Sequence, residues 1–377
     1  MNEPFSRRAF LKVIGGGIAG MASTAGSASG MQNDRVTIDM KIGQMLIAGF
    51  RGLEVKPAMP IIEEIKAFHL GGVILYDRDV MTGSPVRNVK SPQQVSDLVA
   101  GLQVASEIPL LVTIDQEGGL VDRLRPDRGF PSSLSASYLG GKNDLDLTRR
   151  RAGAMASNLR QIGVNLNLAP VVDLNVNPNN PIIGRRKRSF SDDPTIVTAH
   201  AKAFVEAHHE HDVLCCLKHF PGHGSSASDS HLGFTEVTDS WTPNELIPYT
   251  NLINSNHADT VMISHVFHEK LEPEYPATLS RRIITGMLRE KMGYDGVVIS
   301  DDLQMGAISK HYGFESALRN AINAGTDLIT LGNNQVFEEG LIGRAFMLIK
   351  DMIEDGRIPT ERVEEAYGRV RRLKGLG

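Results

Sequence analysis

The stretch VLCCLKHFPGHG, residues 213–224, joins a run of apolar residues to a cluster of basic and imidazole side chains. Its first five residues are continuously apolar, as in a parallel strand that is covered on both faces. The polar residues begin where such a strand would end, and Pro221 and Gly222 then interrupt regular structure. Functional groups at the carboxyl end of a buried strand are typical of α/β folds.

Seven more candidate strands, most of them continuous apolar runs, lie on either side of that stretch. We expect the strands at residues 44–50, 72–76, 110–115, 164–172, 213–218, 260–265, 296–300 and 327–331. Amphipathic segments alternate with them, including a stripe of Ile61, Ile62 and Ile65, a capping box at 242–245 and a last helix from about Thr360. This alternation predicts an α/β fold, a single (β/α)8 TIM-type barrel over residues 31–377. A doubly wound open sheet is the alternative.

The composition is that of an ordinary globular protein. Of the 377 residues 41% are hydrophobic and 22% are charged, with a net charge of −4, so no nucleic-acid partner is expected. Cys215 and Cys216 are adjacent, which rules out a disulfide framework and the paired spacing of a zinc site. No apolar stretch reaches the length of about 18 residues that a membrane span needs, so no stable membrane anchor is expected.

Residues 1–30 differ from the rest of the chain. Arg7 and Arg8 precede a short apolar, glycine-rich run, and small residues follow up to Ala28. This order predicts an export signal, and the paired arginines resemble those read by the twin-arginine machinery. A short N-terminal anchor helix is the alternative. We therefore expect an exported protein, periplasmic or extracellular, that folds before export and needs no disulfide.

The ends of the expected strands are rich in functional groups. They carry Asp115, Glu117, Asp173, Lys218, His219, His265 and Asp301, with Asp229 and His231 in the loop after 213–218. A metal-dependent hydrolase would use His219, His223, His231, His265 and an Asp as ligands. A glycoside hydrolase would use a carboxylate nucleophile and a separate acid/base. Asp301 suits the nucleophile, and Asp229 stands two residues before His231, where it can polarise the imidazole.

At this point the residues match a known pattern. KHFPGHG at 218–224, followed by DSH at 229–231, resembles the signature of glycoside hydrolase family 3 in its β-N-acetylglucosaminidase branch. DQEGG at 115–119, RSF at 188–190, SDD at 300–302 and AGTD at 324–327 extend the match in the family's order. The resemblance implies a TIM-type barrel without cofactor or metal that removes terminal β-linked N-acetylglucosamine with retention. The substrate would be a peptidoglycan fragment or a chitooligosaccharide.

The resemblance also assigns roles. Asp301 would form the glycosyl–enzyme bond, and His231 would be the general acid and then the base, with Asp229 as its partner. The positions that hold the sugar hydroxyls are matched by Asp115, Arg123, Arg188, Lys218 and His219. We expect the loop with Gly222 and Gly224 to be flexible, so that His231 can swing over the sugar.

Two features set this chain apart within the resemblance. Leu120 stands where the family usually has Arg. The chain also ends too soon after Asp301 for the second domain that supplies a glutamate acid/base in related β-glucosidases, which favours the branch that uses His. A neutral base repels an incoming anion less than a carboxylate does, so phosphorolysis is an alternative to hydrolysis. A metal-dependent barrel hydrolase and a catalytically inactive sugar-binding barrel also stay open.

Overall fold

Eight parallel strands form one sheet in the computed structural model, which describes residues 36–56, 58–230 and 233–376. The strand order is β11-β9-β7-β6-β3-β2-β1-β12. The two ends of this order also meet, because Ile299 bridges Leu328 and the Ser300 N–H donates to the Leu328 carbonyl at 2.9 Å. The sheet is therefore a closed barrel, as predicted. The strands are β1 (Leu46–Gly49), β2 (Gly72–Leu75), β3 (Leu111–Ile114), β6 (Leu166–Asn167), β7 (Leu214–Phe220), β9 (Thr260–Ile263), β11 (Val297–Ser300) and β12 (Ile329–Leu331).

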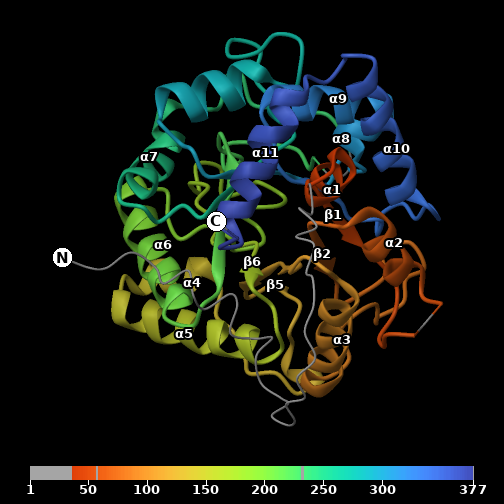
Figure 1. The fold of residues 1–377 in the computed structure, drawn as a ribbon. Helices are drawn as coiled ribbons and strands as arrows, with labels where there is room; N and C mark the ends of the chain where they lie inside the picture. Colours follow the sequence, from red (N-terminus) through yellow and green to blue (C-terminus); the bar gives the residue numbers. More distant parts are fainter. Residues whose placement is uncertain (1–35, 57, 231–232, 377) are drawn as a thin grey trace, which may run out of the picture.

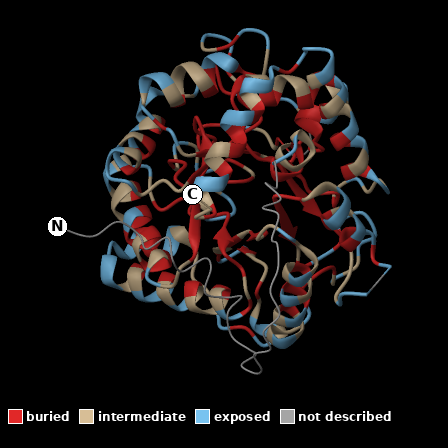
Figure 2. Cartoon of the chain, viewed as in Figure 1, coloured by how far each residue is buried: buried red, intermediate tan, exposed pale blue. Residues whose placement is uncertain are grey.

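Helices surround this barrel (Figure 1). They are α1 (Ile38–Gln44), α2 (Pro60–Phe68), α3 (Pro92–Ala105), α4 (Ala136–Lys142), α5 (Leu145–Gln161), α6 (Pro194–His209), α7 (Ile247–Asn254), the π-helix η5 (Arg282–Lys291), α8 (Gly306–Ser309), α9 (Phe314–Ala324), α10 (Leu341–Glu354) and α11 (Thr360–Leu373), with the 3₁₀ turns η2 (Pro126–Arg128), η3 (Pro243–Leu246) and η4 (Ala277–Leu279). Buried residues gather on the strands and on the inward faces of the helices (Figure 2). Within the described part of the chain, no helix combines the length and the apolar character needed to cross a membrane.

The second helix shows how the local sequence produces this arrangement. Pro60 occupies the first turn of α2, where its missing N–H costs nothing. Ile61, Ile62 and Ile65 fall on one face and are buried against the barrel, as predicted. The helix ends at Phe68, and the capping residue His69 adopts a left-handed conformation with φ of 51°.

Two local expectations need correction. The strand expected at 164–172 is regular only over Leu166–Asn167, because Pro170 has no N–H to donate to a ladder. Beyond it, Val171 still bridges Lys218. At 242–245 a helix does begin with Pro243, but the Thr242 side chain makes no cap hydrogen bond and the first turn is 3₁₀.

The last helix closes the amino-terminal end of the barrel. Val370 and Leu373 of α11 pack against the apolar barrel interior, and α11 lies over the middle of the ring in Figure 1. The buried Lys374 Nζ donates to Gln44 Oε1 at 2.6 Å, just before β1. Burial lowers the pKa of Lys374 to about 7.

Near the opposite end, four side chains form one layer across the barrel. Ile74, Met262 and Thr330 come from β2, β9 and β12, and Leu168 follows β6, so the layer uses alternate strands. All four are buried, and they lie beneath a polar cavity at the carboxyl ends of the strands. This is the end of a TIM-type barrel that carries active sites.

Candidate functional site

The cavity at the carboxyl ends of the strands has a volume of about 510 Å³. It brings together seven of the eight residues that the sequence predicts for the site, from segments almost 200 positions apart. These are Asp115, Arg123, Arg188, Lys218, His219, Asp229 and Asp301. The eighth, His231, lies outside the described residues. The predicted residues therefore form one cavity rather than separate helix caps.

Asp301 follows β11 directly, which places it at the rim of the barrel. Its N–H donates to the Ile263 carbonyl at 3.1 Å, and its Oδ1 accepts the Asp302 N–H at 2.8 Å. The neighbouring Asp302 is buried, and its Oδ1 accepts the N–H groups of Gln304 and Gly332, each at 3.1 Å. Backbone and carboxylate of Asp301 are thus both oriented, and the residue lines the cavity.

A chain of alternating charges crosses the floor of the site. Lys218 Nζ, in a side chain only 2% exposed, lies 2.7 Å from both Asp115 Oδ1 and Glu117 Oε1. Arg188 donates to both oxygens of Glu117 at 2.7 Å. Burial alone would raise the pKa of Glu117, but the charges of Arg188 and Lys218 outweigh burial and hold the pKa below its usual range. Burial likewise lowers the pKa of Lys218, yet Asp115 and Glu117 raise it overall.

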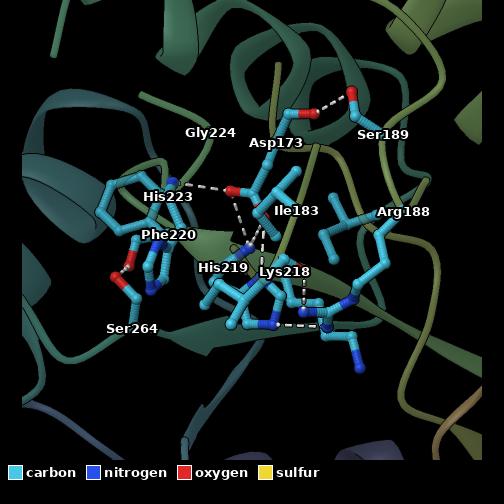
Figure 3. A network of polar contacts seen from close by, with 12 residues as sticks. Asp173, Ile183, Arg188, Ser189, Lys218, His219, Phe220, His223, Gly224 and Ser264 are labelled. Carbon is cyan, nitrogen blue, oxygen red and sulfur yellow. Dashed lines mark hydrogen bonds and ion pairs between the residues drawn. The ribbon is translucent and has the colours of Figure 1, made fainter. Parts of the chain in front are cut away.

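Figure 3 shows that this series of charged contacts continues to Asp173. Asp173 is a buried aspartate that is not among the predicted site residues. Asp173 Oδ2 lies 2.7 Å from His219 Nδ1, and His219 Nε2 lies 3.2 Å from an Arg188 nitrogen. Because a guanidinium only donates, Nε2 accepts and the His219 proton sits on Nδ1, directed at Asp173. Asp173 also accepts the N–H groups of His219 and His223. Burial raises and the nearby His219 lowers the pKa of Asp173, with a net decrease.

Arg123 enters the site through a small hairpin, β4 (Gln116–Gly118) and β5 (Val121–Asp122). Gln116 Oε1 accepts the N–H groups of Arg123 and Leu124 at 3.0 and 3.1 Å, which fixes the chain after the hairpin. Arg123 then reaches Asp115 at 3.6 Å and Asp77 at 3.4 Å. Leu120, at the hairpin tip, is 61% exposed and presents an apolar side chain at the cavity rim.

The loop after β7, expected to be flexible, is closely packed in its first part. Gly222, Gly224, Ser225 and Ser226 are all buried, and His223 Nδ1 lies 2.8 Å from Ser226 Oγ. Asn180 Nδ2 donates to the carbonyls of His223 and Gly224 and to Ser226 Oγ. On the far side, Ser230 bonds His223 Nε2 through its hydroxyl and Ala307 N–H through its carbonyl. Asp229 therefore stands on a segment that is anchored on both sides.

A second buried acid, Glu245, contacts the backbone of this loop. Glu245 is 0% exposed, and its Oε2 accepts the Gly224 N–H at 3.2 Å. A Cβ at Gly222, where φ is 128°, would lie 2.6 Å from the same oxygen, so this close approach requires glycine. Oε1 of Glu245 is buried without a hydrogen-bond partner among the described residues. Asp173 and Glu245 together thus accept three backbone N–H groups, that of His219 near the end of β7 and those of His223 and Gly224 in the turn after it.

Replacing Glu245 by Gln is expected to stabilise the protein at neutral and alkaline pH. Burial, and then the charge of Asp173, raises the pKa of Glu245 from 4.5 to about 7. The folded protein therefore keeps a proton that the unfolded chain releases, so the wild type loses stability as the pH rises from about 4.5 to about 7. Gln has no proton to lose, so the advantage of Glu245→Gln should grow over this window by up to ~3 kcal/mol.

Urea unfolding of wild type and variant between about pH 4 and pH 8 measures this difference. Glu290→Gln, at an exposed position on η5, is the matched control and should show no such trend. An advantage of Glu245→Gln that stays constant with pH would contradict a buried, protonated Glu245.

Among the described residues, the histidines of the site bond to protein groups and are not grouped as metal ligands. His219 and His223 use both ring nitrogens as described above, and His265 bonds Thr278 Oγ1 at 2.7 Å and the Asp302 carbonyl at 2.9 Å. Within the described ranges, no three His, Cys, Asp or Glu side chains are grouped to hold a metal ion. His208, in the last turn of α6, is fully buried and stacks on Phe204.

Comparison with known proteins agrees with this geometry. The model of the glycosyl hydrolase family 3 N-terminal domain matches residues 37–373. Beta-hexosaminidase A of Pseudoalteromonas piscicida is 32% identical over 90% of this chain, and the chain spans 61% of that protein's length. A beta-hexosaminidase of Xanthomonas oryzae pv. oryzae is 35% identical over 79% of this chain and 86% of its own length.

Solved structures show the same fold. A family 3 β-N-acetylglucosaminidase from a Paenibacillus species superposes with a TM-score of 0.82 at 36% identity, over 90% of this chain and 62% of that one. A β-N-acetylhexosaminidase from Beutenbergia cavernae gives 0.80 at 26% identity, over 90% and 98% of the two chains. This chain therefore belongs to glycosyl hydrolase family 3 and carries the barrel of that family's N-terminal domain, in its β-N-acetylglucosaminidase branch.

Proposed function

We propose that this chain is a retaining exo-β-N-acetylglucosaminidase. The observation that carries the proposal is the cavity itself, in which Asp301 and Asp229 meet the five residues matched to sugar binding. The names of the relatives and of the solved structures support the same activity. The substrates are terminal β-linked N-acetylglucosaminides, from peptidoglycan fragments or chitooligosaccharides.

The residues divide the reaction between them. Asp301 attacks the anomeric carbon and forms a glycosyl ester while protonated His231 gives its proton to the leaving oxygen. In the second step His231 takes a proton from water, the water oxygen bonds to the anomeric carbon, and Asp301 leaves as carboxylate. Two inversions give net retention. Asp229, on the anchored loop, favours the protonated imidazole that the first step needs.

The charged floor holds the sugar. Two of the three Lys218 donors are directed at Asp115 and Glu117, which leaves one for a sugar hydroxyl. Arg188 is engaged by Glu117, the Ile182 carbonyl and His219, so it acts mainly by fixing its neighbours. Asp115 and Arg123 meet at the side of the cavity and offer an acceptor and donors to the same hydroxyl groups.

The test is product analysis with the purified full chain. An aryl β-N-acetylglucosaminide, chitobiose and purified muropeptides are compared with and without phosphate, and NMR identifies the first anomer released. Free N-acetylglucosamine as the β-anomer supports the proposal. Release of sugar 1-phosphate would instead show that the enzyme is a phosphorylase. Loss of activity with chelators would indicate a metal-dependent hydrolase. Binding without cleavage would indicate an inactive sugar-binding barrel.

His231→Ala should affect substrates according to their leaving groups. An unactivated sugar leaving group needs a proton, so its kcat/KM should fall by about 100- to 10,000-fold. An activated aryl group leaves without protonation, so the rate of the first step with an aryl glycoside should fall far less. Steady-state kinetics on chitobiose and on a 2,4-dinitrophenyl glycoside measure the two effects, and equal losses would contradict the acid role.

We also propose export through the twin-arginine machinery. Its support is the sequence of residues 1–30, which lie outside the described residues. N-terminal sequencing of the protein recovered from periplasm or medium tests it. A new terminus near Ala28 is expected, and an uncleaved chain confined to the cytoplasm would refute export.

A further inference from the structure

Tyr76 lies in the cavity at the end of β2, and the roles proposed above do not use it. Its ring packs against the apolar barrel interior, and the residue is half-buried where it lines the cavity. Its backbone is held from both sides, because Tyr76 N–H donates to Asn88 Oδ1 at 3.0 Å and Asn88 N–H donates to the Tyr76 carbonyl at 2.9 Å. The side chain therefore projects from a fixed base.

The hydroxyl of Tyr76 reaches the acidic side of the cavity. A Cβ on Gly332 would lie 2.4 Å from both Tyr76 Oη and Asp302 Oδ2, so these two oxygen atoms are near neighbours. The hydrogen bonds of Tyr76 within the described residues involve its backbone, and the hydroxyl has none there. Burial, and then the charges of Asp302 and Asp115, raise the pKa of Tyr76 well above its usual value, so the phenol keeps its proton.

We propose that the Tyr76 hydroxyl is a substrate-contacting group, which donates a hydrogen bond to a hydroxyl of the N-acetylglucosamine in this cavity. This inference rests on the proposed function. Its neighbours Asp115, Asp301 and Asp302 only accept hydrogen bonds when ionised. A sugar hydroxyl donates and accepts at once, so one that donates to a carboxylate still needs a donor. Tyr76 supplies that donor beside the carboxylates.

The contact also affects specificity. A cavity donor without a protein partner loses its water when the sugar enters, and a sugar lacking the matching hydroxyl leaves it unsatisfied. Sites built to bond a hydroxyl reject analogues without it more strongly than apolar sites do. Tyr76 should therefore raise selectivity for sugars with that hydroxyl in place.

The experiment combines Tyr76→Phe with altered substrates. Wild type and variant are assayed on 4-nitrophenyl β-N-acetylglucosaminide and on its 3-, 4- and 6-deoxy analogues. On the parent substrate, kcat/KM of Tyr76→Phe should fall about 10-fold. On one deoxy analogue the two proteins should be equal, because the contact is already missing. Tyr138→Phe, on the exposed face of α4, is the control and should match the wild type throughout.

Several outcomes would overturn the proposal. An unchanged kcat/KM of Tyr76→Phe on the parent substrate would show that the hydroxyl does not contact the sugar. A loss by the same factor on every analogue, or a displaced pH profile, would mean that Tyr76 acts through a carboxylate and not on the sugar. Failure of the wild type on every substrate would instead refute the proposed function, so the two failures are distinguishable. Thermal unfolding of Tyr76→Phe should match the wild type, since its hydroxyl has no partner in the described residues.

Discussion

Asp301→Ala abolishes turnover, with an expected fall in kcat of about 10,000-fold or more on every substrate. Without the carboxylate no oxygen is placed to form the bond to the anomeric carbon. The fold should persist, because the backbone N–H of residue 301 still donates to Ile263, and the lost acceptor for Asp302 N–H costs only about 1 kcal/mol. Circular dichroism and urea unfolding check the fold, and steady-state kinetics check the rate.

Azide makes this experiment specific for a nucleophile. The space left by the carboxylate admits a small anion, so azide should restore turnover of an activated aryl glycoside and yield the α-glycosyl azide. The control Asp295→Ala, at a side chain 74% exposed and paired with Arg369 and Arg372, should keep full activity. Substantial residual hydrolysis by Asp301→Ala, or no azide product, would remove Asp301 from this role.

Of the substitutions proposed here, Lys218→Met should cause the largest decrease in the free energy of unfolding. Met has a similar shape, but the change leaves Asp115 and Glu117 as neighbouring carboxylates in a buried site without their shared cation. Removing one partner from a buried ion pair typically costs about 3–5 kcal/mol. Urea unfolding at neutral pH measures this, with Lys270→Met as control. Lys270 is 69% exposed beside Asp239, so its loss should cost at most about 1 kcal/mol.

The pH dependence separates lost charge from lost packing. Without Lys218, the pKa values of Asp115 and Glu117 rise, and both groups take up protons at higher pH than in the wild type. The stability deficit of Lys218→Met should therefore shrink as the pH falls towards about 4, because protonated acids need no cation. A deficit that is equal at acidic and neutral pH would indicate a packing defect and contradict the electrostatic account.

Most of the barrel follows from local pattern. Runs that are mostly apolar mark the strands, because each strand of a parallel barrel is covered on both faces. The least accurate strand prediction is 164–172, where Asn165 and Asn167 alternate with apolar residues and Pro170 lacks the N–H that a strand residue would donate. The capping box predicted at 242–245 does not form as expected. The Thr242 side chain makes no cap hydrogen bond, and the Glu245 side chain accepts the Gly224 N–H.

The site was predictable where it follows strand ends. Asp115, Lys218, His219 and Asp301 come at or directly after strands, and the carboxyl ends of parallel strands converge in a barrel. Tyr76 follows a strand in the same way, but an aromatic residue there is indistinguishable in sequence from one that packs in the core. Glu117 lies in the DQEGG motif at 115–119, but its pairing could not be predicted because its partner Arg188 is 71 residues away in the sequence.

The sequence by itself determined the barrel and the set of polar groups at its rim, since both depend on residue type and spacing along the chain. Only the tertiary structure decided which charges are paired. Asp173 and His219 are separated by 46 positions in the sequence, and Lys218 and Asp115 by 103. Such pairs depend on distance and burial. A carboxylate in water interacts only weakly with a cation. It forms a strong, oriented ion pair when folding removes the water around it and brings the cation within hydrogen-bond distance.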